Sequence, residues 1–255
     1  MSFDLDHVAI GLHDITETLF ALVGELGGVP IHGGEIVGFR SMQIRLGDGQ
    51  RGMTVELLEP FNVHLNDFLA RFLARSGVGP HHLTFKVKDI AAELERLEDL
   101  GYQPINVNLS NEMWQEAFLH PKDAHGTVVQ IAQPGMHTPM ATLLADSLAG
   151  RPHAMTEWWP QPPARAAHPV TLERVVLNTP APEAAQAFFI EVLGGSPDPE
   201  CADECQVVWP GGARLALEHH PDTAPGIDRF ELTGREPGER VIGGTKFRFI
   251  GGSRF

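Results

Sequence analysis

Four polar side chains stand at corresponding places in the first half of the sequence: His7, Glu56, His82 and Gln130. The two histidines are 82 − 7 = 75 residues apart, and Glu56 and Gln130 are 130 − 56 = 74 residues apart. Two imidazoles, a carboxylate and an amide oxygen suit a divalent Zn, Ni, Co, Mn or Fe(II) ion. A single histidine on a strand is more often a structural hydrogen-bonding group, so the near-equal offsets are what favour a metal site.

Side-chain alternation is consistent with this grouping, because residues two apart on a β-strand share a face. In the first strand, Val8 and Ile10 share an apolar face and His7 lies on the other. The same split holds around the other three residues. If the apolar faces pack under helices, the four polar side chains project together from a concave face.

The elements that would position these residues follow the order β, α, β, β, β twice, which indicates an internal repeat. The first set comprises a strand at Leu5–Leu12, a helix capped by Asp14 and running from Ile15 to Leu26, and strands at Ile36–Gly38, Ser41–Leu46 and Met53–Leu58. The second set comprises a strand at His81–Val87, a helix capped by Asp89, and strands at Gln103–Leu109, Met113–Leu119 and Thr127–Ala132.

Residues 135–169, rich in Pro, His and Ala, are predicted to form a linker with one helix at Met140–Leu148. Its Trp158 and Trp159 are too large to remain in water and should pack on a domain. Residues 170–255 indicate a third βαβββ-like module and an abbreviated fourth. The predicted fold is α+β: residues 1–134, with modules at 4–60 and 80–134, form a curved, partly open mixed sheet, and 170–255 form a degenerate second pair.

The second half carries different chemistry at the matching positions. Arg174 stands where the first half has His7, Arg229 where it has His82, and Arg248 where it has Gln130, while Leu217 replaces the glutamate. This half therefore lacks a metal-binding set. Three guanidinium groups on one face could hold a carboxylate or phosphate, although strand arginines more often pair with nearby acids.

Composition excludes several classes of function. With 19 Lys and Arg against 33 Asp and Glu, the net charge of −14 offers no basic stripe for nucleic acid. No apolar run approaches the length of a membrane span, and the N-terminus does not resemble a signal peptide. Cys201 and Cys205 match neither a zinc pair nor a disulfide framework, so we expect a cytoplasmic protein. Open strand edges would permit a homodimer.

Four segments, Asp6–Ile10, Val55–Pro60, His81–Phe85 and His120–Asp123, together resemble the vicinal oxygen chelate superfamily of glyoxalases, bleomycin-resistance proteins and extradiol dioxygenases. The similarity is closest to methylmalonyl-CoA epimerase and glyoxalase I-like proteins. It implies that the positions of His7, Glu56, His82 and Gln130 bind a divalent metal ion, which polarises a carbonyl or enediolate oxygen while a carboxylate moves a proton.

One position departs from that family pattern, since relatives usually have glutamate where this chain has Gln130. An amide can bind a metal through oxygen but cannot accept a proton near neutral pH. The base would then be Glu56 or Glu35, which is not one of the four predicted ligands. The alternative for Glu35 is a solvated carboxylate on a loop. The same departure leaves the Fe(II) triad of the dioxygenases incomplete. His125, on a turn, is an unlikely additional acid or base.

The resulting hypothesis is a metal-dependent enzyme, either an isomerase or epimerase or a carbon–sulfur lyase, that transfers a proton alpha to a carbonyl. Its partner would be a small carbonyl or carboxylate compound. The alternative is a non-catalytic binding protein of the bleomycin-resistance type. A purely structural protein is disfavoured, because it would leave four polar strand residues without a purpose.

Overall fold

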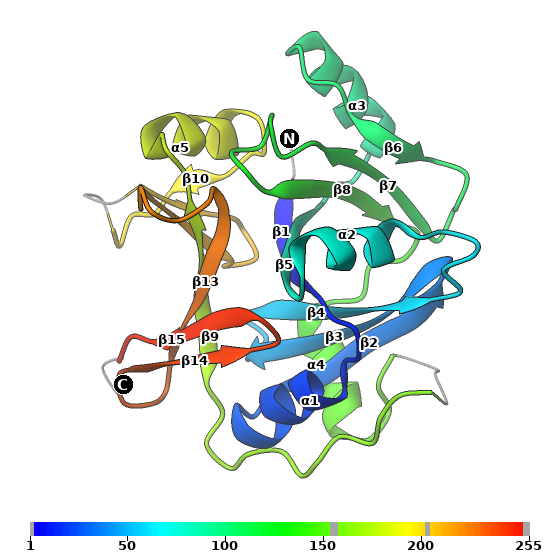
Figure 1. The fold of residues 1–255 in the computed structure, drawn as a ribbon, viewed down its shortest axis with the longest axis vertical. Helices are drawn as coiled ribbons and strands as arrows, with labels where there is room; N and C mark the ends of the chain where they lie inside the picture. Colours follow the sequence, from blue (N-terminus) through cyan, green and yellow to red (C-terminus); the bar gives the residue numbers. More distant parts are fainter. Residues whose placement is uncertain (1–2, 154–157, 202–204, 252–255) are drawn as a thin grey trace. The chain divides into compact units, whose positions relative to one another are not determined.

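The strands of the protein form two mixed β-sheets in a computed structural model that describes residues 3–153, 158–201 and 205–251 (Figure 1). The first sheet contains, in order, β2 (Val29–Ile36), β3 (Gly38–Gly47), β4 (Gly52–Phe61), β1 (Asp4–Gly11), β5 (Gly79–Lys86), β8 (Val128–Pro134), β7 (Trp114–Leu119) and β6 (Ile105–Asn108). The second contains β10 (Ser196–Pro197), β11 (Gln206–Val208), β12 (Arg214–Glu218), β9 (Thr171–Asn178), β13 (Gly226–Thr233), β15 (Thr245–Phe249) and β14 (Gly238–Ile242).

The helices complete the modules that the sequence predicts. They are α1 (Thr16–Phe20), which continues into the π-helical turn η1 (Ala21–Glu25), then α2 (Phe68–Ser76), α3 (Ile90–Asp99), α4 (Met140–Leu148) and α5 (Pro182–Glu191). The first two modules each run β, α, β, β, β. Among the residues that the structure describes, the second sheet repeats the strand order of the first but lacks a counterpart of β6 and has no helix between β13 and β15. The predicted α+β fold class is confirmed.

Local side-chain chemistry sets the helix ends. The Asp14 carboxylate accepts a hydrogen bond from the Thr16 backbone N–H (2.7 Å), and the Asp89 carboxylate accepts one from that of Ala92 (3.1 Å). These bonds satisfy donors that a helix start leaves unpaired. Gly27 and Gly101 follow the helices with φ of 73° and 88°, a left-handed conformation that glycine adopts without strain.

Several elements differ from the prediction. A strand was expected at 36–38, but β2 spans Val29–Ile36 and Val37 forms the turn into β3. Gly33 and Gly34 inside β2 have no side chain, so the strand does not show a regular alternation of apolar and polar residues. Helix α2 was missed, although its apolar residues Phe68, Leu69, Phe72 and Leu73 have helical spacing. Strand β14 lies in a charged, glycine-rich segment that suggested no regular structure.

The chain forms two compact units, each assembled from three separate segments. Unit 1 comprises Met1–His7, His81–His137 and Arg174–Asp228, and unit 2 comprises Val8–Pro80, Thr138–Glu173 and Arg229–Phe255. The sequential domain boundaries at residues 134 and 170 stay a prediction. None of the helices in the described ranges is long and apolar enough to cross a membrane.

Within unit 2, the predicted linker packs on the sheet. Helix α4 has the bounds expected from the sequence, and its buried Leu144 contacts Val29 and Ile31 of β2. The tryptophan pair also lies against this unit: the Arg40 guanidinium stacks over the Trp158 ring at 4.7 Å, and the Trp159 ring fills the space above Gly33. Glu157, in the same predicted cluster, lies outside the described residues.

Two adjacent glycines on β2 provide a test of this packing. A Cβ on Gly33 would overlap Cζ2 of the Trp159 ring, whereas a Cβ on Gly34 would meet nothing within 4 Å. Gly33→Ala should therefore destabilise the protein by about 1–3 kcal/mol through overpacking. Gly34→Ala should have a much smaller effect. Urea unfolding of the two variants measures the difference, and equal midpoints would contradict the packing of the linker on β2.

Candidate metal centre

The polar face of unit 1 is formed by neighbouring strands in a fixed register. Thr84 of the parallel strand β5 lies opposite Gln130 of β8, and Gln130 lies opposite Phe118 of the antiparallel strand β7. His82 and Glu116, two residues along their strands, share this face. The apolar residues of the other face are fully buried: Leu83, Phe85, Ala117, Leu119, Val129 and Ile131. Alternation thus presents polar side chains on one face and a core on the other.

Two histidine rings meet in unit 1. His7 and His82 are 1% and 4% exposed, and their ring centroids are 6.0 Å apart in an edge-on arrangement. His82 Nδ1 lies 2.7 Å from His81 Nδ1. His82 Nε2 is buried and makes no hydrogen bond to any residue that the structure describes. Burial, with the neighbouring His81 and His7, holds the pKa of His82 well below 6.5. His82 is thus neutral near pH 7, the form that binds metal ions.

The ring of His7 is oriented by a carboxylate. Asp6 Oδ2 lies 2.7 Å from His7 Nδ1, and Asp6 Oδ1 lies 2.7 Å from Lys86 Nζ. Burial alone would raise the pKa of Asp6, but Lys86 and His7 outweigh it and lower that pKa far below 3.8. An ionised carboxylate only accepts hydrogen bonds, so Nδ1 of His7 carries the proton. In the neutral ring, Nε2 is then the nitrogen with a lone pair, an arrangement common among metal-binding histidines.

Gln130 belongs to a continuous hydrogen-bond chain. The Thr84 hydroxyl donates to Gln130 Oε1 at 2.6 Å, and Gln130 Nε2 donates to Glu116 Oε2 at 2.6 Å. The same oxygen of Glu116 accepts from Trp114 Nε1 at 3.2 Å. Sequence reasoning missed Glu116. Its alternation with Trp114 and Phe118 on one strand was the available signal, but its partner on the next strand is known only from the register.

Glu56 lies on β4 in unit 2, where it is 8% exposed. It pairs across the sheet with Gln43, whose Nε2 donates to Glu56 Oε1 at 3.2 Å. Leu58, two residues further along, shares this face and packs with Ala9 and helix α2. The helix, which the sequence reading missed, covers the face with the apolar side chains of Leu69, Leu73, Phe68 and Phe72. Apolar side chains of α2 thus cover this face of β4 at Leu58, two residues from Glu56.

Glu35 has different surroundings in unit 2. Its Oε1 accepts a hydrogen bond from Arg40 Nε at 3.1 Å, and Arg40 lies opposite Glu59 on β4. Arg40 and Gln43 are three residues apart on β3, so their side chains point to opposite faces. The register thus gives Glu35 an ion-pair partner and no shared face with Glu56.

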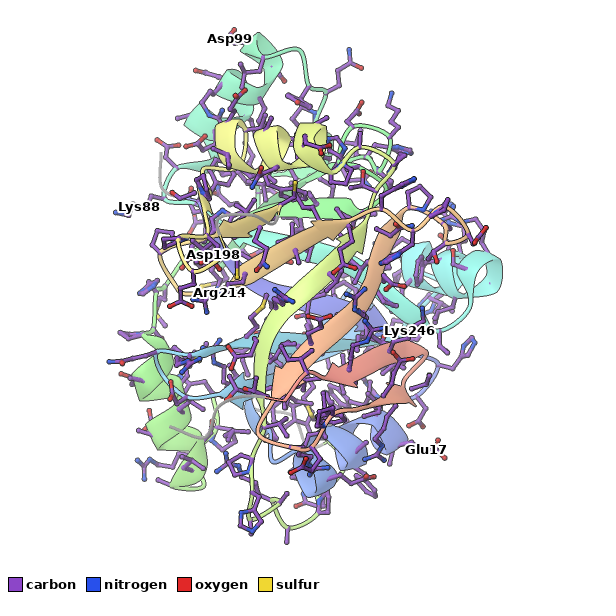
Figure 2. The ribbon with its side chains drawn as sticks, turned by 90° about the vertical axis from the view of Figure 1, so that its left-hand side faces the viewer. Glu17, Lys88, Asp99, Asp198, Arg214 and Lys246 are labelled. Carbon is purple, nitrogen blue, oxygen red and sulfur yellow. The ribbon has the colours of Figure 1, made fainter. Side chains whose placement is uncertain are left out.

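Two of the predicted anion-binding arginines, Arg229 and Arg248, lie on the paired strands β13 and β15. On β13 and β15, where Figure 2 labels Lys246, Glu231 lies opposite Arg248 as Thr84 lies opposite Gln130. Arg229 Nε is 2.7 Å from Glu231 Oε1 in a buried ion pair, and Arg248 Nη2 is 3.2 Å from Glu239 Oε2. Arg229 and Arg248, the two predicted anion-binding residues in unit 2, therefore each have a carboxylate partner. Arg174 lies on β9 in unit 1.

The remaining residues singled out from the sequence have structural surroundings. His125 lies on a turn with φ of 53°, and its ring packs on Phe188 with centroids 5.5 Å apart. Burial lowers its pKa. Cys201 and Cys205 are free thiols.

Comparison with known proteins gives a family and a fold. A family described as the Glyoxalase/Bleomycin resistance/Dioxygenase superfamily matches residues 6–118. An ethylmalonyl-CoA/methylmalonyl-CoA epimerase of Cereibacter sphaeroides is 29% identical over 140 residues, which cover 51% of this chain and 96% of that protein.

Two solved structures illustrate the extent of the likeness. A variant of Streptomyces coelicolor methylmalonyl-CoA epimerase, in complex with 2-nitronate-propionyl-CoA, is 24% identical with a TM-score of 0.46, over 52% of this chain and 98% of that chain. A hypothetical protein of Staphylococcus aureus is 12% identical with a TM-score of 0.66, over 98% of this chain and 99% of that chain. The second likeness shows that the fold of nearly the whole chain has a known counterpart.

The Asp6 network leads to a pH-dependent prediction for the metal-free protein. Because the pKa of Asp6 is lower in the folded state than the roughly 3.9 of an unfolded chain, its stabilising effect is complete above that value and is lost as the pH falls. Asp6→Asn should cost about 2–4 kcal/mol at pH 7 by leaving Lys86 without its partner. Urea unfolding from pH 7 to pH 2 should show this difference shrinking below about pH 4.

The matched control is Asp99→Asn, since Asp99 is exposed at the end of α3 (Figure 2). It should change the unfolding free energy by less than about 0.5 kcal/mol at every pH. A difference for Asp6→Asn that stayed constant with pH would contradict the ionised carboxylate.

Proposed function

Residues 6–118 belong to the Glyoxalase/Bleomycin resistance/Dioxygenase superfamily, and on that premise we propose that this protein is a divalent-metal-dependent isomerase of the epimerase type. Its reaction would be proton transfer alpha to the carbonyl of an acyl-CoA thioester. The substrate class follows from the named activity of the Cereibacter sphaeroides relative. The observation that carries the proposal is the neutral, buried His82, whose Nε2 makes no hydrogen bond within the described chain and whose ring meets that of His7.

The donor set fits a transition-metal ion. His7 and His82 offer imidazole nitrogen, Gln130 an amide oxygen and Glu56 a carboxylate, and the histidines with Glu56 are of the types that hold such ions. The proposal assigns all four to one ion, as the sequence repeat does. A divalent ion bound by them would stabilise negative charge that develops on the thioester oxygen.

Glu56 is the proposed base. Gln130 cannot accept a proton, and Glu35 points to the opposite face of its sheet from Glu56, so among the predicted residues only Glu56 remains. The carboxylate would remove the proton on the carbon next to the carbonyl, leaving an enolate and a neutral Glu56. The bond from Gln43 orients one oxygen of the Glu56 carboxylate, and the apolar side chains of α2 pack on Leu58, which shares that face of β4.

A specific residue also favours the alternative function. Loss of the family's last glutamate, here Gln130, suits a protein that binds a small molecule on the same face without chemistry. Such a protein need not hold a metal ion. Metal content therefore separates the two functions.

The first test is the metal content of the purified protein by elemental mass spectrometry. We expect about one equivalent of a transition metal in the wild type and less than a tenth of that in His7→Ala and His82→Ala. His64→Ala, which removes an exposed histidine, is the control and should keep full occupancy. If the wild type takes up no Zn, Ni, Co, Mn or Fe(II) after reconstitution, the enzyme mechanism is wrong and the binding protein is the better account.

The base assignment is tested by incorporation of deuterium from heavy water into methylmalonyl-CoA, followed by mass spectrometry. Glu56→Gln should slow exchange by about 100-fold or more, since general base catalysis contributes about 10²–10⁴. Glu35→Gln should stay within about threefold of wild type, because its partner Arg40 points away from the Glu56 face. The reverse ranking of the two variants would assign the base to Glu35.

A further inference from the structure

Glu116 is a partly buried carboxylate to which neither the sequence repeat nor the proposed reaction gives a role. It lies on β7 opposite Ala132 and one diagonal step from Gln130, to whose amide nitrogen it is joined at 2.6 Å. Trp114 Nε1, which can only donate, bonds to the same carboxylate oxygen from two residues away. The carboxylate is therefore held in place on the polar face of unit 1.

We propose that Glu116 is a positioning residue that fixes the orientation of the Gln130 amide and so makes its oxygen the group that binds metal. This inference rests on the proposed function, because it needs a metal ion at Gln130. Glu116 itself does not touch the ion or the substrate. It acts through Gln130 alone.

The need for such a residue follows from the chemistry of an amide. A carboxylate presents the same oxygens after a half-turn, whereas a half-turn of an amide exchanges its oxygen for an NH₂ group that cannot bind a cation. The Thr84 hydroxyl beside Gln130 can donate or accept, so it tolerates both orientations. An ionised carboxylate accepts only. Glu116 therefore favours the orientation that has Nε2 toward β7 and Oε1 toward β5, the strand that carries His82.

The first module contains the same pair of residue types with the roles exchanged. There Gln43 on β3 donates to Glu56 on β4, so an amide supports a carboxylate. In the second module Glu116 on β7 accepts from Gln130 on β8, so a carboxylate supports an amide. Each predicted ligand other than histidine thus has a complementary partner on the adjacent strand of its own unit. The two pairs indicate that the glutamate and the glutamine can exchange places in the second module only if both positions are changed together.

The experiment measures Ni²⁺ affinity by titration calorimetry of the metal-free full-length protein near pH 7. Glu116→Ala should weaken binding about 10–100-fold, the usual effect of removing a group that orients a ligand. Glu116→Gln, which keeps the shape and loses the charge, should weaken it severalfold. Glu112→Gln removes an exposed carboxylate ahead of the same strand and should leave affinity unchanged.

The double variant Glu116→Gln/Gln130→Glu restores the pair with its members exchanged. It should recover wild-type affinity or exceed it, and the visible absorption spectrum of the Co²⁺ form should then differ from that of wild type, because a carboxylate replaces an amide oxygen. A purely structural role would instead lower the melting temperature of metal-free Glu116→Gln and leave its affinity unchanged.

Wild-type affinity in both single variants at Glu116 would overturn the inference, and so would a double variant weaker than Glu116→Gln alone. These results differ from failure of the proposed function. If the wild type itself binds no Ni²⁺ and no Co²⁺, the metal site is wrong. If the wild type binds and the Glu116 variants bind equally well, only the positioning role is wrong.

Discussion

Burying a polar side chain in a sheet costs free energy unless hydrogen bonds replace those lost from water, and this cost shapes the polar face of the protein. Each candidate ligand has a hydrogen-bonding neighbour that both offsets the cost and sets a direction: Asp6 for His7, His81 for His82, Gln43 for Glu56, Thr84 and Glu116 for Gln130. The other nitrogen of His82, Nε2, is buried without a hydrogen bond in the described chain. Because the neighbouring polar groups are hydrogen-bonded, the buried Nε2 of His82 is a candidate for binding a ligand from outside the chain.

The second sheet shows that the scaffold and the site are separable. Its strands follow the order of the first, and Glu231 and Arg248 occupy the register of Thr84 and Gln130. The donor atoms, however, have been replaced by charges that neutralise each other, as in the buried pair of Arg229 with Glu231. The same backbone therefore supports either a cluster suited to a cation or an internal ion-pair network, and the choice depends on a few outward positions.

Much of the fold was predictable because it depends on local patterns. Alternation identified nearly every strand of the first sheet, and Asp14 and Asp89, whose carboxylates bond backbone N–H groups of the first turns, marked the helix starts. The missed strand β2 contains Pro30 and two glycines, which have no apolar side chain to show the period. The placement of α2 over Leu58 and the contact of Glu116 with Gln130 depend on residues distant in sequence. Such tertiary contacts leave no local signal in the sequence. The four candidate ligands were therefore predicted without helix α2 and without the supporting carboxylate of Glu116.

The division of the chain into interleaved units bears on how the protein reaches its native state. Neither unit consists of one continuous stretch, and the boundary between them even falls inside β1, after His7. Each unit needs residues beyond position 173 for completion. During synthesis on the ribosome, all eight strands of the first sheet, which come from residues 4–134, are available for pairing before the segments beyond position 173 that complete each unit are made. Long loops closed between remote segments slow folding and prolong the exposure of strand edges. The architecture thus divides folding into an early stage, in which the first sheet forms from contiguous sequence, and a slower stage, in which each unit gains its remote C-terminal segment.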